Sequence, residues 1–239
     1  MTLEPSSPLP LYHQLERVLA ERIAEGRYRD AFPGDLELAA EFSVSRGTVR
    51  QALDRLARSG LIVRHQGRGS FVSAPLEYPL GRFYRFAHEM HVRGIPESSR
   101  VLARAVVRAP ATVTAALGLG KGERVLRIVR LRLAGDRPLL LETSHFPEAV
   151  GAPLRFADLS EGSLYDRLEG SGVRLSRVTE EVHPVALRDE EARPFGLPAG
   201  APAFAVERLA FAAERPVEHR LVLAPGDRVT LTASWGDLA

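Results

Sequence analysis

The chain has 239 residues, of which 45% are hydrophobic, so it is long enough for two domains and apolar enough to build real cores. It contains no cysteine, which excludes disulfides, thiolate nucleophiles and metal sites ligated by cysteine, and its formal net charge is only +2. No run approaches the roughly eighteen apolar residues of a membrane span, and the start lacks the pattern of a signal peptide, so we expect a cytoplasmic protein without a membrane partner.

The N-terminal part, residues 1–75, is predicted to follow the order helix, helix, turn, helix, hairpin. Pro33 and Gly34 mark the turn before the second helix, Ser45 is a good N-cap for the third, and Gly60 supplies the left-handed residue that closes it. The expected helices cover residues 11–23, 36–42 and 46–59, and the expected strands cover residues 61–64 and 70–72.

Positive charge is concentrated in one part of this region. Residues 44–75 hold six arginines against Asp54 alone, whereas residues 1–43 hold four arginines against eight acidic residues. Such a window is a candidate footprint for a polyanion, although a small local excess of charge is often only a solvated face.

The third helix and the hairpin after it suit the two grooves of DNA. Arginine near the start of a helix can donate two hydrogen bonds to guanine in the major groove, and Ser or Thr can bond to a phosphate or a base edge. In the hairpin tip Arg68 lies between two glycines, so the backbone can approach a groove while the guanidinium reaches a phosphate or the minor groove. The candidate DNA contacts are Ser45, Arg46, Thr48, Arg50, Arg68 and Gly69.

A boundary between two domains is predicted where residues 74–81 combine two prolines and a glycine without periodicity. We therefore expect a DNA-binding domain over residues 1–75, a linker over residues 76–82 and a second domain over residues 83–239. A helix within residues 82–94 is followed by strand patterns that alternate with short helices.

The second domain contains an imperfect internal repeat. "GLGKGERVLRIVRLRLAGDRPL" from Gly118 aligns with "GLPAGAPAFAVERLAFAAERPV" from Gly196 at a constant offset, which also matches Arg130 with Arg208. Each copy reads as a short helix, a turn, a strand, a tight turn and a returning strand. The repeat predicts two related α+β units that share one mostly antiparallel sheet.

The strand expected over residues 125–134 places Leu126, Ile128, Arg130 and Arg132 on one face. Two arginines at the end of an otherwise apolar face are typical of an anion site, because guanidinium recognises carboxylate or phosphate in a planar, bidentate way. Two exposed arginines at a sheet edge would give the same spacing, and the spacing alone leaves both interpretations open.

The sequence resembles a known family in both parts. "PLYHQLERVLAERIAEGRY" and "FPGDLELAAEFSVSRGTVRQALDRLARSGLIVRHQGRGSFV" look like the winged helix-turn-helix domain of the GntR family of bacterial transcription regulators. "RLRLAGDRPLLLETSHFP", "LSEGSLYDRLEGSGVRLSRVTEEVHPVAL" and "GAPAFAVERLAFAAERPVEHRLVLAPGDRV" are similar to the UTRA effector-binding domain of the HutC-type subfamily, whose fold is like that of chorismate lyase.

The resemblance implies a homodimer that binds a palindromic operator and responds to a small ligand. It also implies that the effector is bound by Arg130, Arg132, Glu142, Ser163, Tyr165 and Glu218. One departure concerns DNA: the family usually has "PSERELA" where this chain has "PGDLELA", so Leu36 stands in place of an arginine. We therefore expect Arg46, Arg50 and Arg68 to carry most of the reading.

Taken together, these observations predict an α/β protein of two domains. The first is a winged helix-turn-helix of three helices and a β-hairpin, and the second is an α+β domain with a mostly antiparallel, chorismate-lyase-like sheet. The predicted function is that of a repressor released from its operator by a small anionic effector, such as a phosphorylated sugar or a small organic or amino-acid derivative, with no catalytic activity, cofactor or metal. Two alternatives stay open, a lyase-like enzyme with a DNA-binding appendage and a dimerising DNA-binding protein without a ligand.

Overall fold

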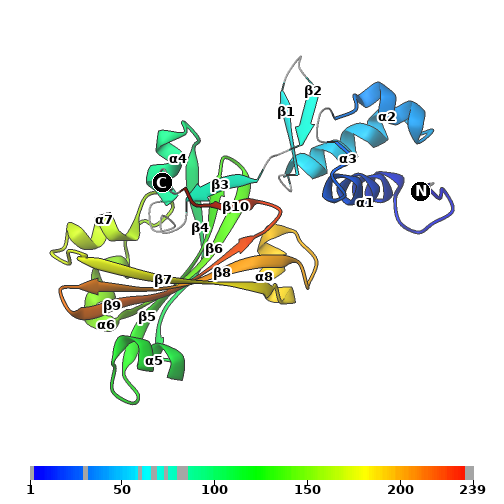
Figure 1. Cartoon of the computed structure of the whole chain (residues 1–239). Coiled ribbons are helices and arrows are strands. Elements are labelled where there is room, and N and C mark those ends of the chain that lie inside the picture. The colour runs from blue at the N-terminus through cyan, green and yellow to red at the C-terminus, as the bar shows by residue number, and fades with distance from the viewer. Residues whose placement is uncertain are drawn as a thin grey trace, which may run out of the picture. The chain divides into compact units, whose positions relative to one another are not determined.

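The computed structural model describes residues 3–28, 32–58, 61–65, 69–72, 75–79 and 86–234. The chain divides into two compact units, residues 1–74 and residues 75–239 (Figure 1). None of the helices in these described ranges is long and apolar enough to cross a membrane.

The first unit has the predicted order of elements. Its helices are α1 (Leu11–Ala24), α2 (Asp35–Glu41) and α3 (Arg46–Arg58), and its antiparallel hairpin consists of β1 (Ile62–His65) and β2 (Gly69–Val72). Helix α2 begins where the Gly34 amide donates to the carboxylate of Glu37 at 2.8 Å, and α3 begins where the Thr48 amide donates to Ser45 Oγ at 3.1 Å. These bonds satisfy amides that a helix start leaves without an intrahelical partner.

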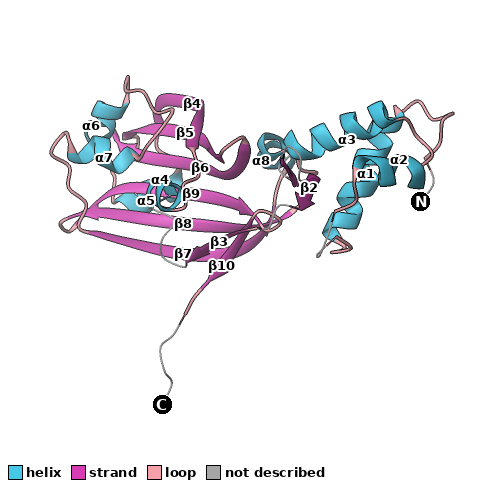
Figure 2. Cartoon of the chain, turned by 90° about the horizontal axis from the view of Figure 1, so that it is seen from above, coloured by secondary structure: helices cyan, strands magenta, loops and turns pink. Residues whose placement is uncertain are grey.

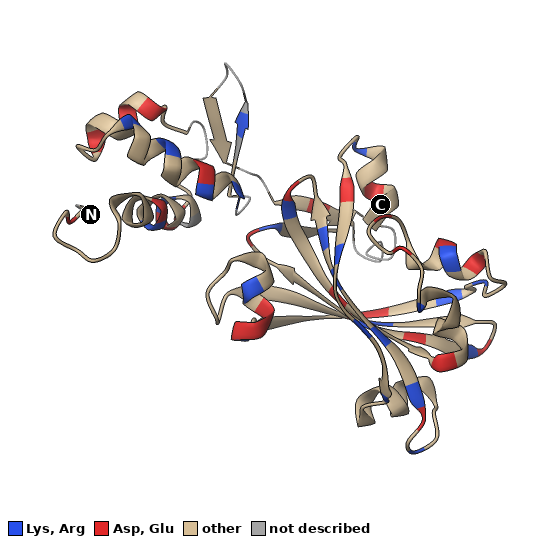
Figure 3. Ribbon diagram, turned by 180° about the vertical axis from the view of Figure 1, so that it is seen from behind, with Lys and Arg blue, Asp and Glu red and all other residues tan. Residues whose placement is uncertain are grey.

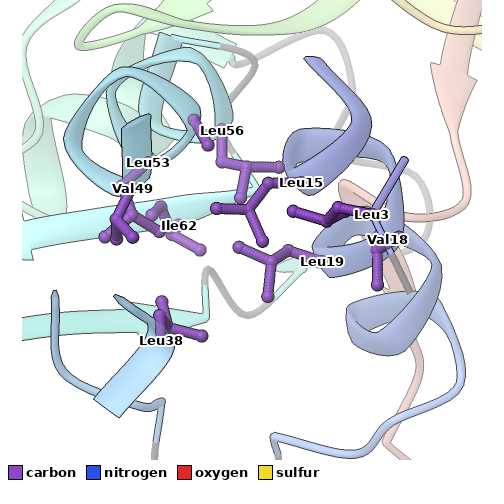
Figure 4. Packing of buried hydrophobic residues seen from close by; sticks show 10 residues of the cluster. Leu3, Leu15, Val18, Leu19, Leu38, Val49, Leu53, Leu56 and Ile62 are labelled. Atoms are coloured by element: carbon purple, nitrogen blue, oxygen red, sulfur yellow. The ribbon is translucent and has the colours of Figure 1, made fainter. Parts of the chain in front are cut away.

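Apolar side chains from all three helices and the hairpin form one core in this unit (Figure 4). Leu15 and Leu19 of α1 face Leu53 of α3, Leu38 of α2 lies below them in this view, and all four are fully buried. Burial of each such side chain contributes about 1.5–3 kcal/mol, so this core fixes the third helix against the other two.

The second unit is built on a six-stranded antiparallel sheet with the strand order β4-β5-β6-β9-β8-β7, which Figure 2 shows from one edge to the other. Its strands are β4 (Glu97–Arg108), β5 (Arg124–Ala134), β6 (Arg137–Pro147), β7 (Arg177–Ala186), β8 (Pro202–Ala212) and β9 (Arg215–Pro225).

The internal repeat is visible in this sheet. Hairpin β5–β6 and hairpin β8–β9 begin at Arg124 and Pro202, which are equivalent positions of the two copies, and the hairpins lie next to each other through β6 and β9. Thr143 pairs with Leu221, its own counterpart in the other copy. Because a residue that pairs with its own counterpart lies on the symmetry axis, a local pseudo-twofold axis passes through the centre of the sheet, perpendicular to its surface.

Helices cover both faces of the sheet. On the face that carries Arg130 and Glu142, called here the site face, one end is covered by α4 (Phe86–Val92) and the other by η2 (Ala152–Leu154) and α7 (Leu164–Glu169), which follow α6 (Glu148–Gly151). The opposite face is covered at its two ends by α5 (Ala111–Leu117) and by the pair α8 (Asp189–Ala192) and η3 (Arg193–Phe195). The middle of the site face is left for polar side chains.

The predicted linker differs from the structure in its first half. Residues expected in a linker form β3 (Leu76–Pro79), which pairs in parallel with β10 (Val229–Thr232) near the end of the chain. Tyr78 of β3 is fully buried against α4, and the Leu76 amide donates to the Arg228 carbonyl at 2.7 Å. The partner strand lies at the other end of the second unit in sequence, so local composition could not indicate the pairing.

Candidate functional site

The start of helix α3 presents polar side chains that its cap holds in place. Ser45 Oγ accepts from the Thr48 amide and lies 2.9 Å from the Thr48 hydroxyl, so the two hydroxyl groups are tied together at the first turn. Arg46 and Arg50 are exposed and lie four residues apart, on one side of the helix. The first turns of α3 therefore offer two guanidinium groups and two hydroxyl groups to an external partner.

The arginines of the basic window fall into two groups. Arg55 pairs with Glu16, Arg64 pairs with Asp54 and Asp35, and Arg58 donates to the Asp54 carbonyl. In contrast, Arg46 and Arg50 have no ion pair with any residue that the structure describes. Among the described arginines of the window, the two whose side chains bond to no other described residue thus lie on the part of α3 that the sequence predicts to read DNA.

The hairpin is described in part. Arg68 lies outside the described residues, while Gly69 opens β2 with φ +89° and nothing within 4 Å of the position that a Cβ would take. This left-handed backbone explains the glycine, and the open space around it would permit close approach of another backbone. At the start of α2, Leu36 is 64% exposed, so the position of the family arginine presents an apolar side chain to solvent.

A cavity of about 820 Å³ lies on the site face of the second unit. Arg130, Arg132, Glu142, Ser163 and Tyr165 line it, so five of the six predicted effector residues come together in one place. Glu218 does not line the cavity but accepts a hydrogen bond from the Tyr165 hydroxyl. The other lining residues are Phe86, Ala87, His88, Asp166, Glu169, Leu175, Ser176, Arg177, Val178 and Arg220.

The floor of this cavity is a buried network of charges. Arg130 donates to Glu142 at 2.8 Å from the directly paired strand, and Glu142 also lies 3.6 Å from Arg132 and 3.4 Å from Arg220. Segments of both charges, coloured blue and red, occur near the middle of the sheet in Figure 3. The whole network consists of four arginines and four glutamates, namely Arg130, Arg132, Arg208, Arg220, Glu97, Glu142, Glu180 and Glu218.

The position of β5 decides between the two interpretations of its arginines. Strand β5 lies inside the sheet between β4 and β6, and the arginines at 130 and 132 are only 1% and 2% exposed. The alternative of two exposed arginines at a sheet edge is therefore wrong. Their Nε atoms are buried without a hydrogen-bond partner in the part of the chain that the structure describes, which leaves donor capacity beside the cavity.

Burial and charge both act on these groups. Burial lowers the pKa of Arg130 to about 10, and the nearby arginines add to the shift while Glu142 opposes it. Burial would raise the pKa of Glu142, but the attraction of Arg220, Arg130 and Arg132 outweighs it and holds the pKa of that carboxyl well below its usual value. Glu142 is therefore ionised at neutral pH and serves as the common partner of three arginines.

The turn before α7 is held by the same network. Glu97 accepts from Arg132 at 2.8 Å and from the Gly162 amide at 2.6 Å, while Arg130 donates to the Gly162 carbonyl at 3.4 Å. Ser163 is the N-cap of α7 and accepts from the Tyr165 amide at 3.1 Å. The cap holds the start of α7, the helix from which Tyr165, Asp166 and Glu169 line the cavity, and the Ser163 hydroxyl keeps its own hydrogen available as a donor.

Several residues of the site were missed by sequence reasoning. The repeat aligned Arg208 with Arg130, but nothing in the local sequence indicated that Glu180 would pair with it at 2.8 Å. Glu97 lies on the edge strand β4, far along the chain from Arg132. The Arg132 guanidinium also lies over the ring of Phe86 at 4.6 Å, which links the cavity to the first helix after β3.

Comparisons with known proteins agree in both units. Residues 11–72 match the family described as "Bacterial regulatory proteins, gntR family", and residues 93–230 match the UTRA domain. The chain is 34% identical to the HTH-type transcriptional repressor NagR of Bacillus subtilis, over 96% of each chain, and 28% identical to the histidine utilization repressor of Klebsiella aerogenes, over 97% of each. Its structure is similar to the crystal structure of PhnF from Mycobacterium smegmatis, with a TM-score of 0.64 and 28% identity over 92% of this chain and 98% of that one.

Proposed function

The chain belongs to the gntR family of bacterial regulatory proteins and carries a UTRA domain. We propose that it is a DNA-binding repressor controlled by a small effector, with one site for DNA in the first unit and one site for the effector in the second. Members of the family are transcription regulators and not enzymes, so the lyase-like alternative is set aside.

DNA is read by the first turns of α3 in the major groove, together with the hairpin tip. The observation that carries this assignment is that Arg46 and Arg50 are exposed and unpaired among the described residues, whereas the other described arginines of the window bond to protein groups. The hydroxyl groups of Ser45 and Thr48 flank them, and Arg68 and Gly69 contact a phosphate or the minor groove. Leu36 replaces the family arginine, so it offers only apolar contact.

The effector is a small molecule with an acidic group, and it binds in the cavity of the site face. Arg130 and Arg132 bind the acidic group, and Ser163 and Tyr165 donate to it or to a neighbouring oxygen. The four glutamates of the network offset its four arginines, and the carboxylate of Glu142 itself lines the cavity. The effector therefore also carries hydroxyl or amino groups that donate to Glu142, as a phosphorylated sugar or an amino-acid derivative does.

The protein acts as a homodimer on a palindromic operator, because two copies of a reading helix match two half-sites. If the effector favours a dimer geometry in which the spacing of the two reading helices does not match the two half-sites, effector and DNA weaken each other's binding by the same factor. The segment around residues 74–81, between the hairpin and α4, transmits the change. A domain that only dimerises, without a ligand, predicts no such coupling.

Two experiments test the proposal. Selection of duplexes from a random pool gives an operator, and Arg46→Ala and Arg50→Ala should then lose about 1–3 kcal/mol of discrimination for it, whereas unchanged discrimination in both variants would refute the reading assignment. A thermal-shift screen of phosphorylated sugars, small organic acids and amino-acid derivatives identifies the effector by the stability that it adds. Arg132→Gln should abolish this shift and spare DNA binding, with Arg188→Gln as the exposed control.

A further inference from the structure

The base of the hairpin is joined to both helices of the helix-turn-helix by one guanidinium group. We propose that Arg64 is a positioning residue, which sets the hairpin against α3 and thereby the selectivity for the operator, without contacting DNA itself. This inference rests on the proposed reading of DNA by α3 and the hairpin.

Three elements meet at this guanidinium. Arg64 lies on β1, and its Nη1 donates to Asp54 Oδ1 of α3 at 2.5 Å. Its Nη2 lies 3.2 Å from Asp35 Oδ2, at the first residue of α2. A single side chain therefore bridges the two helices and the strand that leads into the hairpin tip.

The charges at this point argue against a phosphate contact. Arg64 contributes one positive charge and its two partners contribute two negative charges, so the cluster is net negative. Both terminal nitrogens of the guanidinium are occupied by carboxylates, in contrast with the unpaired Arg46 and Arg50. A phosphate would have to displace a carboxylate and approach the other one, so DNA gains little from this arginine.

The bridge matters because the rest of the hairpin base is short. Strands β1 and β2 have four residues each, and a two-stranded ribbon of this length has little stability of its own. Arg64 is 28% exposed at its side chain, and Asp35 and Asp54 are 35% and 54% exposed. Pairs this exposed add little to overall stability, but a three-element network with two bonds restricts the angle of the strand that carries the tip. Arg64 thus acts on where the tip lies more than on whether the unit folds.

The test compares the full-length protein with Arg64→Gln on two probes, a duplex selected as the operator and a random-sequence duplex of equal length, by fluorescence anisotropy over a series of salt concentrations. We expect the ratio of operator to random affinity to fall about tenfold, within the range that coupling in a network gives, with the salt slope unchanged. Arg64→Lys, which can hold one carboxylate, should recover part of the ratio. Arg58→Gln removes the same charge from the end of α3 and should leave the ratio as it is.

Other outcomes overturn the inference. If Arg64→Gln weakens both duplexes equally and reduces the salt slope by about 0.9, the residue is a phosphate contact. If the ratio of operator to random affinity is unchanged in Arg64→Gln, the residue does not position the hairpin for reading the operator. The variant with Asp35→Asn and Asp54→Asn checks the same bridge from the other side, should Arg64→Gln fail to fold, and it must lower the ratio as well. Failure of the proposed function looks different, because the unmodified protein would then select no operator at all.

Discussion

Replacing Glu142 by glutamine tests whether the charged floor of the cavity is held together by one carboxylate. Glu142 is 1% exposed and lies 2.8 Å from Arg130, 3.6 Å from Arg132 and 3.4 Å from Arg220. Removing one partner of a buried ion pair costs about 3–5 kcal/mol, because the charge left behind stays buried without compensation. Since three arginines lose their common partner here, we expect Glu142→Gln to lower the free energy of unfolding by an amount near the upper end of that range.

Amide hydrogen exchange of β6 measures this loss, because it reports the stability of the second unit by itself. Arg130→Met should lower the free energy of unfolding by less than Glu142→Gln does. The double variant should lower it by less than the sum of the two single losses, since it removes both charges of one pair. Asp189→Asn breaks an exposed pair with Arg193 and should cost at most about 1 kcal/mol. A loss below about 1 kcal/mol for Glu142→Gln, or strict additivity in the double variant, would refute the reasoning.

The loss of stability caused by Glu142→Gln should depend on pH, and the lowered pKa of Glu142 gives the sign of this dependence. The pKa of Glu142 is lowered in the folded state, so the stability that its charge contributes is present at neutral pH and is lost as the pH falls below the usual carboxyl value of 4.5. The difference in stability between the unmodified protein and Glu142→Gln should therefore shrink in acid. A difference that grows as the pH falls would contradict the assignment of Glu142 as an ionised partner.

Three further predictions concern local features. Gly151→Ala places a Cβ 2.8 Å from Leu126 Cβ, and we expect this overpacking to cost about 1–3 kcal/mol, seen as a lowered melting temperature. Ser45→Ala removes the cap of α3 and should cost about 1 kcal/mol in urea unfolding of the first unit, whereas an unchanged midpoint would mean that the cap contributes nothing. Burial lowers the pKa of His145 to about 4, and the neighbouring His219 adds to this shift. The folded state then binds fewer protons than the unfolded state between about pH 4 and 6.5, so the free energy of unfolding should decrease as the pH falls through that range. The variant His145→Asn should remove this contribution to the pH dependence. An imidazole of His145 that titrates near pH 6.5 by NMR would contradict the prediction.

Local patterns were sufficient for much of the fold. The helical spacing of α1 and α3, the cap at Ser45 and the glycines of the hairpin predicted the first unit, because each is decided within a few residues of sequence. The repeat predicted the paired hairpins of the sheet, and the alternation along β5 placed Arg130 and Arg132 on one face. The element that the sequence missed, β3, depends on a strand at the far end of the chain.

The candidate site was predictable only in part, for a physical reason. The sequence shows which residues can carry charge, but whether an arginine is free or neutralised depends on carboxylates from other strands. Glu97 neutralises Arg132 from β4, and Glu180 neutralises Arg208 from β7. The prediction from the resemblance already included Glu142 and Glu218, whereas Glu97 and Glu180 were not expected at the site. Glu142, which lines the cavity beside these arginines, favours those of the proposed acidic effectors that also donate hydrogen bonds.

The pseudo-twofold axis of the sheet bears on how many effector molecules one chain can bind. Glu142 and Arg220 occupy equivalent positions of the two halves, and they meet across the axis with 3.4 Å between Nη1 and Oε1. Two copies of either residue would bring like charges together in a buried place, which is destabilising. The two halves of the repeat therefore carry residues of opposite charge at this position, and these form an ion pair at the centre of the sheet. We therefore expect the two halves to form one composite site, and each chain to bind one effector molecule rather than two.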